Sequence, residues 1–413
     1  MTSTVRTVVT IGAGQTAAVA ARTLRRRGFD GRIVLVGDEA HAPYQRPPLS
    51  KEYLSGEESK DSLMLLPESW RQKNDIELRT GTSATRIDAS GGRVELADGS
   101  TIEADAFLIA TGGSPRTMAV TGTDPDRAHY LRSIDDAERL SSRLRPGAHI
   151  AVLGGGFVGL EIASTAKKLG CHVTVLERQA IPLARIVGSD MGTICTELHR
   201  DNGINVRTGV EIAGVHTTPS EVRITLRTGE VVTTDAVVIG IGIVPNVDIA
   251  TASGLTVDGG ITVDAQGRTS IPNIYAAGDV ASRYSDSAGC HVRVEHFDNA
   301  SRQGSATANL ILGRTGISDA PHWFWSDQFG VNIQFTGHAD YDSIITRGSV
   351  EDREFTAFYL RDGIVRGAFA LDRSEDIGAA RELIGRRCDP HRLHDVDADL
   401  FDLLDDEELA VTS

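Results

Sequence analysis

The residues that could do chemistry begin with a glycine-rich stretch near the middle of the chain. Gly154, Gly156 and Gly159 form a G-x-G-x-x-G pattern between an apolar run and a predicted helix. In this pattern the first glycine allows a tight turn, the second lets backbone approach a pyrophosphate, and the third lets the helix pack on the strand. The apolar run 172–176 then ends in Glu177, at the distance expected of a carboxylate that bonds a ribose 2′-hydroxyl. Together these features predict a dinucleotide site rather than a plain glycine-rich loop.

The same strand–glycine–helix pattern occurs near the start of the chain. The β-rich run 5–11 leads into Gly12-Ala13-Gly14-Gln15-Thr16-Ala17, the variant of the pattern with alanine at its third position. A strand is predicted over 32–36, and either Asp38 or Glu39 supplies the acid for the ribose. The chain therefore contains two predicted dinucleotide sites.

A stiff segment with two cations follows the first site. Residues 43–51 contain three prolines, so the segment is not helical, and it carries Arg46 and Lys51. It could line the ring of a cofactor, or it could be a surface loop that caps a helix starting near Ser50. Spacing alone does not separate these two interpretations.

Three further strands end in residues that suit ligand contact. Ala110-Thr111-Gly112 and Gly240-Ile241-Gly242 end buried apolar runs with small residues, where backbone can approach a ligand. A third strand ends at Gly278-Asp279. The carboxylate of Asp279 could accept a hydrogen bond from a ribityl hydroxyl, or it could simply cap a following helix.

The cysteines exclude one class of chemistry. Cys171, Cys195, Cys290 and Cys388 are far apart, and no C-x-x-C pair or metal-like cluster occurs. Cys171 and Cys195 suit apolar core positions. A disulfide reductase would need a reactive cysteine pair just after the first nucleotide unit, and a cysteine peroxidase would need a single cysteine there. Residues 38–60 contain no cysteine, so neither enzyme is expected. We predict no metal site and no catalytic cysteine.

These residues must be positioned by alternating strands and helices. Helices are predicted over about 16–27, up to Leu169, near 188–202 and over 299–312, and hairpins at 93–103 and around Gly229. From about residue 316 the pattern changes to alternating strands at 332–335, 343–347, 354–360 and 364–371, followed by a helix at about 377–387. This last part is predicted to be a small α+β domain.

Composition bounds the partners. The chain has 413 residues, 40% hydrophobic and 24% charged, as in ordinary globular proteins, and a net charge of −15. That charge argues against nucleic acid or an anionic membrane as partner. Nothing resembles a signal peptide or a membrane span, so we expect a cytoplasmic protein. The acid-rich stretch 395–408 predicts a solvated tail.

The stretches taken together resemble one family, the FAD-dependent, NADH-using ferredoxin reductases, among them the putidaredoxin reductases and the reductase components of Rieske dioxygenases. Arg46-Pro47-Pro48-Leu49-Ser50-Lys51 and Trp325-Ser326-Asp327-Gln328 are its most specific motifs. The others span nearly the whole chain in the family's order: 12–17, 110–112, 130–132, 154–161, 240–242 with 245–246, 277–279, 293–295 with 299–300, and Phe324.

The resemblance implies an α/β fold of glutathione-reductase-like architecture, with two Rossmann-like dinucleotide-binding domains and a small α+β C-terminal domain. The expected FAD-binding domain comprises residues 1–113 and 235–315. The NAD-binding domain is 114–234, and the domain 316–413 would cover the flavin. A monomer or a weak homodimer is expected.

The resemblance also implies site residues. Lys51 and Glu161 would lie near the reactive edge of the flavin, and Trp325 near its face, as the catalytic set. Many relatives carry Trp where this chain has Phe297, so their exact flavin stacking need not be shared. The remaining candidates for contact with FAD are Gly12, Gly14, Gln15, Thr16, Ala17, Asp38, Glu39, Arg46, Pro47, Ala84, Ala110, Thr111, Gly112, Arg132, Asp279, Val280, His296 and Phe297. Those for NAD are Gly154, Gly156, Phe157, Val158, Gly159, Glu177, Arg178, Arg185, Gly240, Ile241 and Gly242.

The implied function is to pass hydride from NADH to FAD, then single electrons to a [2Fe–2S] ferredoxin that serves a P450 or a Rieske oxygenase. Two other enzymes stay open, a rubredoxin reductase and a cysteine-independent NADH oxidase. A protein of another class, similar to apoptosis-inducing factor and sensing NADH by dimerising, is the non-enzyme alternative.

Overall fold

The computed structural model describes residues 5–286, 288–316 and 320–405. The chain divides into two compact units. Unit 1 comprises Met1–Pro47, Glu58–Ser114 and Ile243–Asp319, and unit 2 comprises Pro48–Glu57, Pro115–Gly242 and Ala320–Ser413. Each unit is described below by itself.

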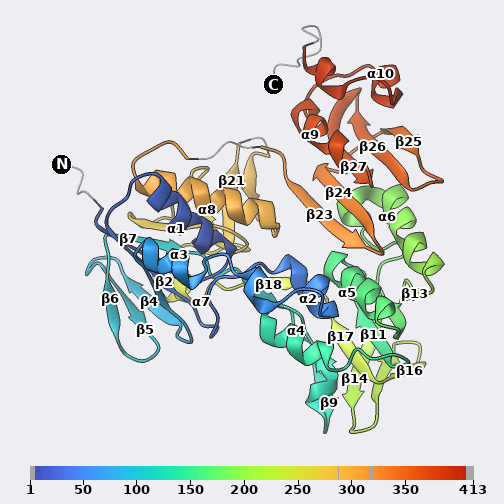
Figure 1. Ribbon diagram of the computed structural model, residues 1–413, viewed down its shortest axis with the longest axis horizontal. Helices are drawn as coiled ribbons and strands as arrows, with labels where there is room; N and C mark the ends of the chain where they lie inside the picture. Colours follow the sequence, from blue (N-terminus) through green and yellow to red (C-terminus); the bar gives the residue numbers. More distant parts are fainter. Residues whose placement is uncertain (1–4, 287, 317–319, 406–413) are drawn as a thin grey trace. The chain divides into compact units, whose positions relative to one another are not determined.

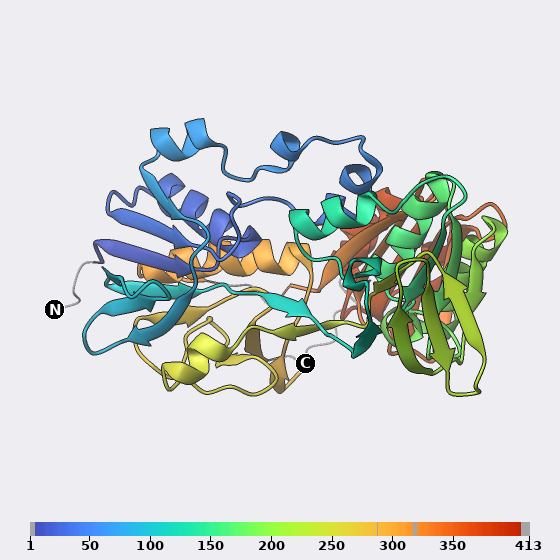
Figure 2. The same ribbon diagram turned by 90° about the horizontal axis from the view of Figure 1, so that it is seen from below.

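Unit 1 is built on a parallel sheet with the first glycine turn at the end of its middle strand. The strand order is β20-β7-β1-β2-β3, from Ile274–Ala276, Ala106–Ile109, Thr7–Ile11, Arg32–Val36 and Ile76–Arg79. These strands are mostly apolar because a parallel sheet is covered on both faces, and the edge strand β3 is the exception, with Glu77 and Arg79. Helices α1 (Gln15–Arg26) and α8 (Phe297–Ile311) lie side by side (Figures 1 and 2).

Short strands and helices complete unit 1. They are β4 (Ala84–Asp88), β5 (Arg93–Leu96), β6 (Thr101–Glu103), β19 (Ile261–Val263), β21 (Ala281–Ser285), β22 (Cys290–Val292), the pair β8 (Gly113–Pro115) and β18 (Ile243–Pro245), α3 (Glu68–Lys73) and α7 (Asp248–Ala252). The predicted hairpin at 93–103 is β5–β6.

The nucleotide part of unit 2 repeats the arrangement of unit 1. Its parallel sheet has the order β10-β17-β11-β12-β13, from Ala128–His129, Ala236–Ile239, His149–Leu153, His172–Leu176 and Asn205–Arg207. The second glycine turn follows β11, the middle strand. The helices are α2 (Glu52–Ser55), α4 (Ile134–Ser141), α5 (Phe157–Lys168) and α6 (Ala184–Asp201). A second sheet holds β9 (Val120–Gly122), β14 (Ile212–Thr217), β15 (Val222–Leu226) and β16 (Val231–Thr234), and β15–β16 is the predicted hairpin around Gly229.

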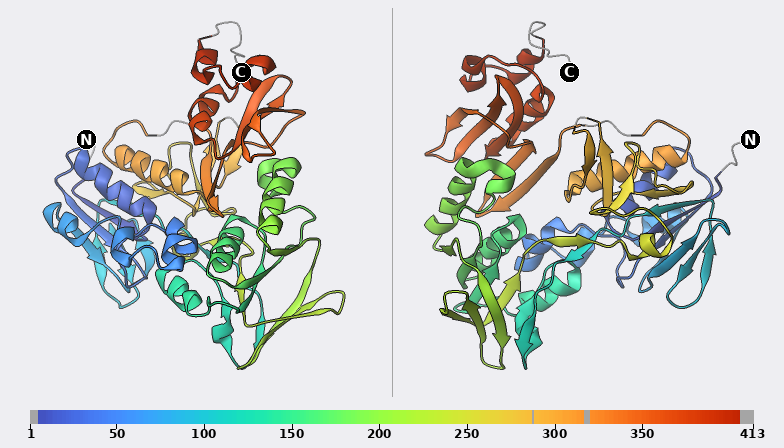
Figure 3. Two further views of the ribbon diagram at one scale, coloured as in Figure 1. Left: turned by 45° about the vertical axis from the view of Figure 1, so that its right-hand side comes forward. Right: turned by 180° about the vertical axis from the view of Figure 1, so that it is seen from behind.

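The C-terminal part of unit 2 is an antiparallel sheet whose strands 354–361 and 364–371 are largely buried on both faces. Its order is β23-β24-β27-β26-β25, from Trp323–Gln328, Val331–Gly337, Ile364–Leu371, Glu354–Arg361 and Ser343–Ser349. Since side chains alternate along a strand, β26 turns Phe355, Ala357 and Tyr359 to one core and Phe358 and Leu360 to another. The second core includes residues of α9 (Ser374–Leu383) and α10 (Pro390–His394), which lie by this sheet in Figure 3.

Two helices differ in detail from the expectation. The helix expected near Ser50 is only a 3-10 turn, Pro47–Ser50, and one turn of α2, because Gly56 in the left-handed region ends it. The last predicted helix runs earlier, over α9, and ends before Gly385, which also has a positive φ of 88°.

The acid-rich stretch is not a solvated tail over its described part. Leu400 and Leu403 are buried in a short 3-10 helix, Leu400–Leu404. The guanidinium of Arg347 donates to the carbonyls of Asp395, Val396 and Ala398. The apolar residues spaced three apart among the acids anchor this segment. Residues 406–408 of the stretch lie outside the described residues.

No helix of the described residues is long and apolar enough to cross a membrane.

The packing of α1 against α8 gives a first prediction. A Cβ at Gly304 would lie 2.5 Å from the backbone oxygen of Thr16, so Gly304→Ala must push the two helices apart. We expect unfolding free energy to fall by about 2 kcal/mol, as for other overpacked cores. Denaturant unfolding measures it.

Gly378→Ala is the matched control. Gly378 is an exposed helical glycine whose added Cβ would meet only the ring of Phe401, at 3.8 Å. That change should leave stability unchanged or raise it by about 0.5 kcal/mol. Equal effects of the two substitutions would contradict the close approach.

Candidate functional site

The two glycine turns have the same geometry for the same reason. Gly12 has a φ of 102° and Gly154 a φ of 104°, a region that favours glycine. A Cβ on Gly12 would lie 2.2 Å from the carbonyl oxygen of Ala110, and one on Gly154 would lie 2.3 Å from that of Gly240. Each turn therefore presses against the end of the next parallel strand, β7 or β17, where the strand order reverses and α/β sheets bind ligands.

The second glycine of each turn faces open space. A Cβ on Gly14 or Gly156 would meet nothing within 4 Å. By contrast, a Cβ on Gly159 would lie 2.3 Å from the oxygen of Gly154, whereas Ala17 is accommodated in the core of unit 1. The second glycines leave room for a group to approach the backbone, which is the fit that a pyrophosphate requires.

The helices that start at these turns have uncapped N-termini. Gly14 and Gly156 are the N-cap residues of α1 and α5, neither helix has a side-chain cap, and neither has an acid in its first turn. The first backbone N–H groups of a helix lack helical partners and carry partial positive charge. Both turns can therefore bind an anionic phosphate.

Acidic residues follow the second strand of each sheet. Glu177 comes directly after β12, and its two carboxylate oxygens accept the backbone N–H groups of Gly155, at 2.6 Å, and Gln179, at 2.7 Å. After β2, Glu39 is bonded to Tyr44 and Arg46, while Asp38 is exposed. Of the two acids open from sequence, Asp38 is the more accessible to a ribose.

Arg46 contacts an acidic and an aromatic side chain of unit 1. It pairs with Glu39 at 2.5 Å and lies over the ring of Tyr44. Burial would lower the pKa of Arg46, but Tyr44, Glu39 and Asp279 outweigh this effect and raise the pKa. The segment is therefore not a loose surface loop. Asp279 is also near enough to Arg46 to contribute to this rise in its pKa.

Asp279 precedes a strand, β21, rather than a helix, so the capping interpretation of this residue was wrong. Gly278 before it donates its N–H to Gln303 of α8 at 2.8 Å, and a Cβ there would lie 2.4 Å from the hydroxyl of Thr16. Asp279 is thus held beside the N-terminal part of α1 and the middle of α8. The Oε1 atom of Gln15, in the same region, is buried without a hydrogen-bond partner, as expected where a ligand would supply one.

Lys51 and Glu161 form a buried ion pair in unit 2. Lys51 Nζ lies 2.8 Å from Glu161 Oε2, and the two side chains are 10% and 6% exposed. Glu161 also accepts the hydroxyls of Ser50 and Ser326, each at 2.5 Å. A carboxylate with three donors is held in one orientation.

Trp325 lies on the opposite face of β23 from this carboxylate. Along the strand Phe324, Ser326 and Gln328 are buried, and the residues between them are half-buried. Trp325 stacks on Trp323, with ring centroids 5.3 Å apart. The alternation explains why Trp325 presents its ring away from α5 while its neighbours anchor the strand.

The other predicted residues have varied positions. Thr111 and Asn246 exchange hydrogen bonds at the end of β7, and Arg132 donates its backbone N–H to Asp136 before α4. The side chain of Val280 is in the core, so only its backbone is available to a ligand. The rest lie at element ends or are exposed: Pro47, Ala84, Gly112, Phe157, Val158, Arg178, Arg185, Ile241, Gly242, His296 and Phe297.

Sequence reasoning missed the roles of Ser50, Ser326, Gln328 and His199. The imidazole Nε2 of His199 lies 2.7 Å from Gln328 Oε1, and Gln328 Nε2 donates to Ser326 at 2.9 Å. A period of two along 324–328 would have placed Ser326 and Gln328 on one face. Nothing in the sequence pointed to His199.

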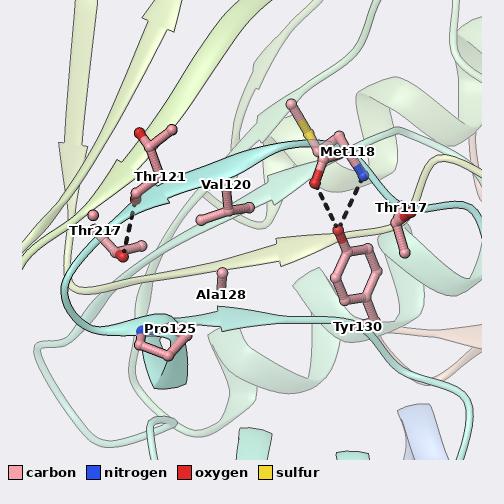
Figure 4. Close-up of a pocket in the computed structure, with 9 residues that line it drawn as sticks. Thr117, Met118, Val120, Thr121, Pro125, Ala128, Tyr130 and Thr217 are labelled. Carbon is pink, nitrogen blue, oxygen red and sulfur yellow. Dashed lines mark hydrogen bonds between the residues drawn. The ribbon is translucent and has the colours of Figure 1, made fainter.

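Figure 4 shows a hollow of about 390 Å³ beside β9 and β14, which contains none of the predicted site residues. The hydroxyl of Tyr130 reaches the backbone of Met118 at its edge. Its lining combines apolar side chains with the hydroxyls of threonines and Tyr130, and it has no charged side chain. It is therefore not a second candidate site.

The burial of His199 gives a prediction for pH. Burial lowers the pKa of His199 from 6.5 to about 4, although its hydrogen bond with Gln328 opposes the shift. The unfolded chain therefore takes up a proton that the folded protein refuses. Stability is fully present above pH 6.5 and is lost as pH falls toward 4. Between about pH 7 and about pH 5, this group should cost about 2 kcal/mol.

Chemical unfolding of the protein and of His199→Gln at both pH values tests this. Glutamine can still donate a hydrogen bond to Gln328 but does not titrate. Between the two pH values, the variant should therefore lose about 2 kcal/mol less unfolding free energy than the unchanged protein. The remaining loss includes the contribution of His129, whose pKa burial also lowers to about 4. Identical pH dependence of the two proteins would refute the assignment.

Comparison with known proteins agrees with this geometry. The model of the family "Pyridine nucleotide-disulphide oxidoreductase" matches residues 6–304, and that of "Reductase C-terminal" matches residues 323–404. The chain is 37% identical to rhodocoxin reductase of Rhodococcus erythropolis, over 95% of this chain and 93% of that one. It is 38% identical to the ferredoxin–NAD(+) reductase component of the anthranilate 1,2-dioxygenase system of Burkholderia cepacia, over 94% and 96%.

A solved structure is similar over nearly the whole chain. In the covalent putidaredoxin reductase–putidaredoxin complex, one chain matches with a TM-score of 0.92 at 33% identity, covering 98% of this chain and 99% of that one. Two parallel dinucleotide-binding sheets and an antiparallel C-terminal domain are common to both. The chain therefore belongs to the ferredoxin reductases of the pyridine nucleotide-disulphide oxidoreductase family, as an FAD-binding oxidoreductase that uses a nicotinamide dinucleotide.

Proposed function

We propose that this enzyme passes hydride from NADH to FAD and then single electrons to a small [2Fe–2S] ferredoxin, which serves a P450 or a Rieske oxygenase. The observation that carries the proposal is the presence of two open, uncapped glycine turns, at Gly14 and Gly156, in a chain without a cysteine in residues 38–60. One turn suits FAD and the other suits NADH. No cysteine pair is available there to take two electrons from the flavin.

Under this proposal residues 1–113 and 235–315 hold FAD, residues 114–234 hold NADH, and residues 316–413 cover the flavin. In the FAD part, the turn at Gly14 would take the pyrophosphate, and Asp38 and Asp279 would bond hydroxyl groups. Lys51, Glu161 and Trp325 would contact the flavin ring. FAD, when bound, supplies the step from a two-electron donor to a one-electron acceptor.

The choice of NADH over NADPH rests on the fixed carboxylate of Glu177. Because both its oxygens accept backbone N–H groups, the charge is held beside the glycine turn, where it would repel a 2′-phosphate. Arg178 next to it could attract that phosphate. However, Arg178 lies 3.3 Å from Glu211, which also pairs with Arg227 at 3.1 Å. Glu211 thus offsets both cations.

Cofactor preference can be measured as kcat/KM with each dinucleotide. We expect a higher kcat/KM for NADH than for NADPH, and a smaller difference between the two values in Glu177→Ala. In Glu211→Gln the kcat/KM for NADPH should rise, because that change releases the two arginines. Glu230→Gln is a suitable control, since Glu230 pairs with Arg207 on the same unit. Equal kcat/KM values for NADH and NADPH in the unchanged enzyme would overturn the preference.

The cysteines have no place in this reaction. Cys171, Cys195 and Cys388 are buried, and burial raises the pKa of Cys171 and raises that of Cys195 to about 12. The thiols of Cys171 and Cys195 are therefore not reactive thiolates at neutral pH. Cys290 is exposed but lies on β22, at the edge of a small sheet.

Replacing all four cysteines with Ser or Ala should therefore leave NADH–ferricyanide turnover within about twofold of the unchanged enzyme. Bound FAD, measured by absorbance, controls for folding. Loss of turnover with FAD still bound would show that one of the thiols is catalytic.

Net charge bears on how the ferredoxin docks. The chain carries −15, and such ferredoxins are typically acidic, so long-range attraction needs a local basic patch. The candidates are Arg71 with Lys73, and Arg302. Arg302 lies 3.7 Å from Asp298, and the Arg71 guanidinium donates to the carbonyl of Leu66. Lys73 is exposed on α3. We propose no nucleic acid or membrane as a partner. We propose that the protein is a monomer or a weak homodimer.

NADH-driven reduction of cytochrome c, with and without ferredoxin, tests the proposed function. We expect turnover to require ferredoxin and to fall as salt rises, because salt screens charges beyond about 8–10 Å. Lys73→Gln should weaken the salt dependence, with Lys60→Gln as a surface control. Equal reduction of cytochrome c or oxygen without any of several ferredoxins would replace the proposal by an NADH oxidase.

A further inference from the structure

The buried groups around Glu161 extend further than the ion pair. We call them the Glu161 network, which comprises Ser50, Lys51, Glu161, Ser326, Gln328 and His199. All six lie in unit 2, on the segment before α2, on α5, on β23 and on α6. Ser326, Gln328 and His199 are fully buried, so water cannot replace a lost partner.

The hydrogen bonds of the network all lead to one carboxylate. Gln328 donates its amide to Ser326, so its oxygen must accept, and the ring nitrogen Nε2 of His199 is therefore a donor. Ser326 in turn donates to Glu161. His199 Nδ1 is buried without a hydrogen-bond partner. The chain of donors has one direction, from His199 to Glu161.

The same contacts fix the strand that carries Trp325. Helix α5 and strand β23 meet at three points along their length: Phe157 packs on Phe324 with ring centroids 4.6 Å apart, Glu161 bonds Ser326, and Ser164 Oγ accepts the N–H of Phe329. A slip of one residue in β23 would bring Trp325 to the place of Ser326. The network therefore sets the face on which Trp325 lies.

We infer that Ser326 and Gln328 are positioning residues for flavin reduction, which hold the Glu161 carboxylate and thereby the Lys51 ammonium in one arrangement. This inference rests on the proposed function. Ser326 donates to one carboxylate oxygen, Oε1, while Lys51 and Ser50 bind the other, Oε2. Without Ser326 the carboxylate is free to turn about its bond to the side chain, and its charge is less neutralised.

The test uses the FAD-loaded protein and stopped-flow reduction by NADH. In Ser326→Ala, we expect the limiting rate to fall about tenfold, the effect of losing one hydrogen bond to a buried charge. The KM for NADH should not change. The flavin midpoint potential should become more negative, because the stronger negative field disfavours adding charge to the flavin. Ser326→Thr keeps the hydroxyl and should restore both. Gln328→Met, one step further away, should have a smaller effect in the same direction.

Thr336→Val is the matched control. Thr336 is a fully buried hydroxyl in the same sheet that donates to the carbonyl of His322 and does not bond Glu161. It should lower the melting temperature without changing the rate or the potential. In a double-mutant cycle, Ser326→Ala should add nothing to Glu161→Gln, because Ser326 acts only through that carboxylate.

The inference fails if Ser326→Ala is reduced at the unchanged rate and potential, or if its effect adds fully to that of Glu161→Gln. It also fails if Thr336→Val slows reduction as much for the same loss of stability. These outcomes differ from failure of the proposed function, in which the unchanged protein itself would not be reduced by NADH.

Discussion

A single buried carboxylate organises unit 2. An ionised group away from water is costly unless it is paired and hydrogen-bonded, and Glu161, which is 5% exposed, meets this condition with an ammonium and two hydroxyls. Its donors come from the segment before α2 and from β23, more than a hundred residues away on either side. Removing any donor leaves the charge less satisfied, so the three segments are bound to a common arrangement. The C-terminal sheet is thus tied to the nucleotide part of unit 2 by charge as well as by apolar packing.

The two parallel sheets solve a second problem in the same way. In each, the turn after the middle strand lies so close to the end of the neighbouring strand that only glycine fits, and the helix that follows starts without a cap. The resulting N–H groups need an acceptor, and a dinucleotide phosphate is one. Under the proposed function, Glu177 would add selectivity to the second sheet, because backbone N–H groups hold both of its oxygens. Under that proposal, phosphate would be bound by backbone geometry more than by particular side chains.

The antiparallel C-terminal sheet has a different logic. Strand β26 is buried on both faces between its ends, and residues 355–360 are apolar except for Thr356. Strand β23 alternates because only one of its faces is fully covered. The covered face of β23 carries Phe324, Ser326 and Gln328, which attach it to α5 and α6. The other face leaves Trp325 half-buried beside Trp323. The attachment and the proposed flavin contact are thus made by adjacent residues of one strand.

Much of this could be predicted from sequence, because local patterns encode local structure. The two fingerprints, the strands around them, the hairpins and the strands of the C-terminal sheet follow from glycine spacing and from periods of two and 3.6 residues. The motif residues Lys51, Glu161 and Trp325 were also recognisable.

Other features required the tertiary structure. Whether Asp38 or Glu39 is free depends on Arg46, which takes Glu39 into an ion pair. The start of the acid-rich stretch is held by Arg347, from a strand some fifty residues earlier. The link from Glu161 through Ser326 and Gln328 to His199 joins three elements, and no local period relates them. Hydrogen-bond partners that are distant in sequence are decided by how helices and strands pack, and that information is carried only by the folded chain.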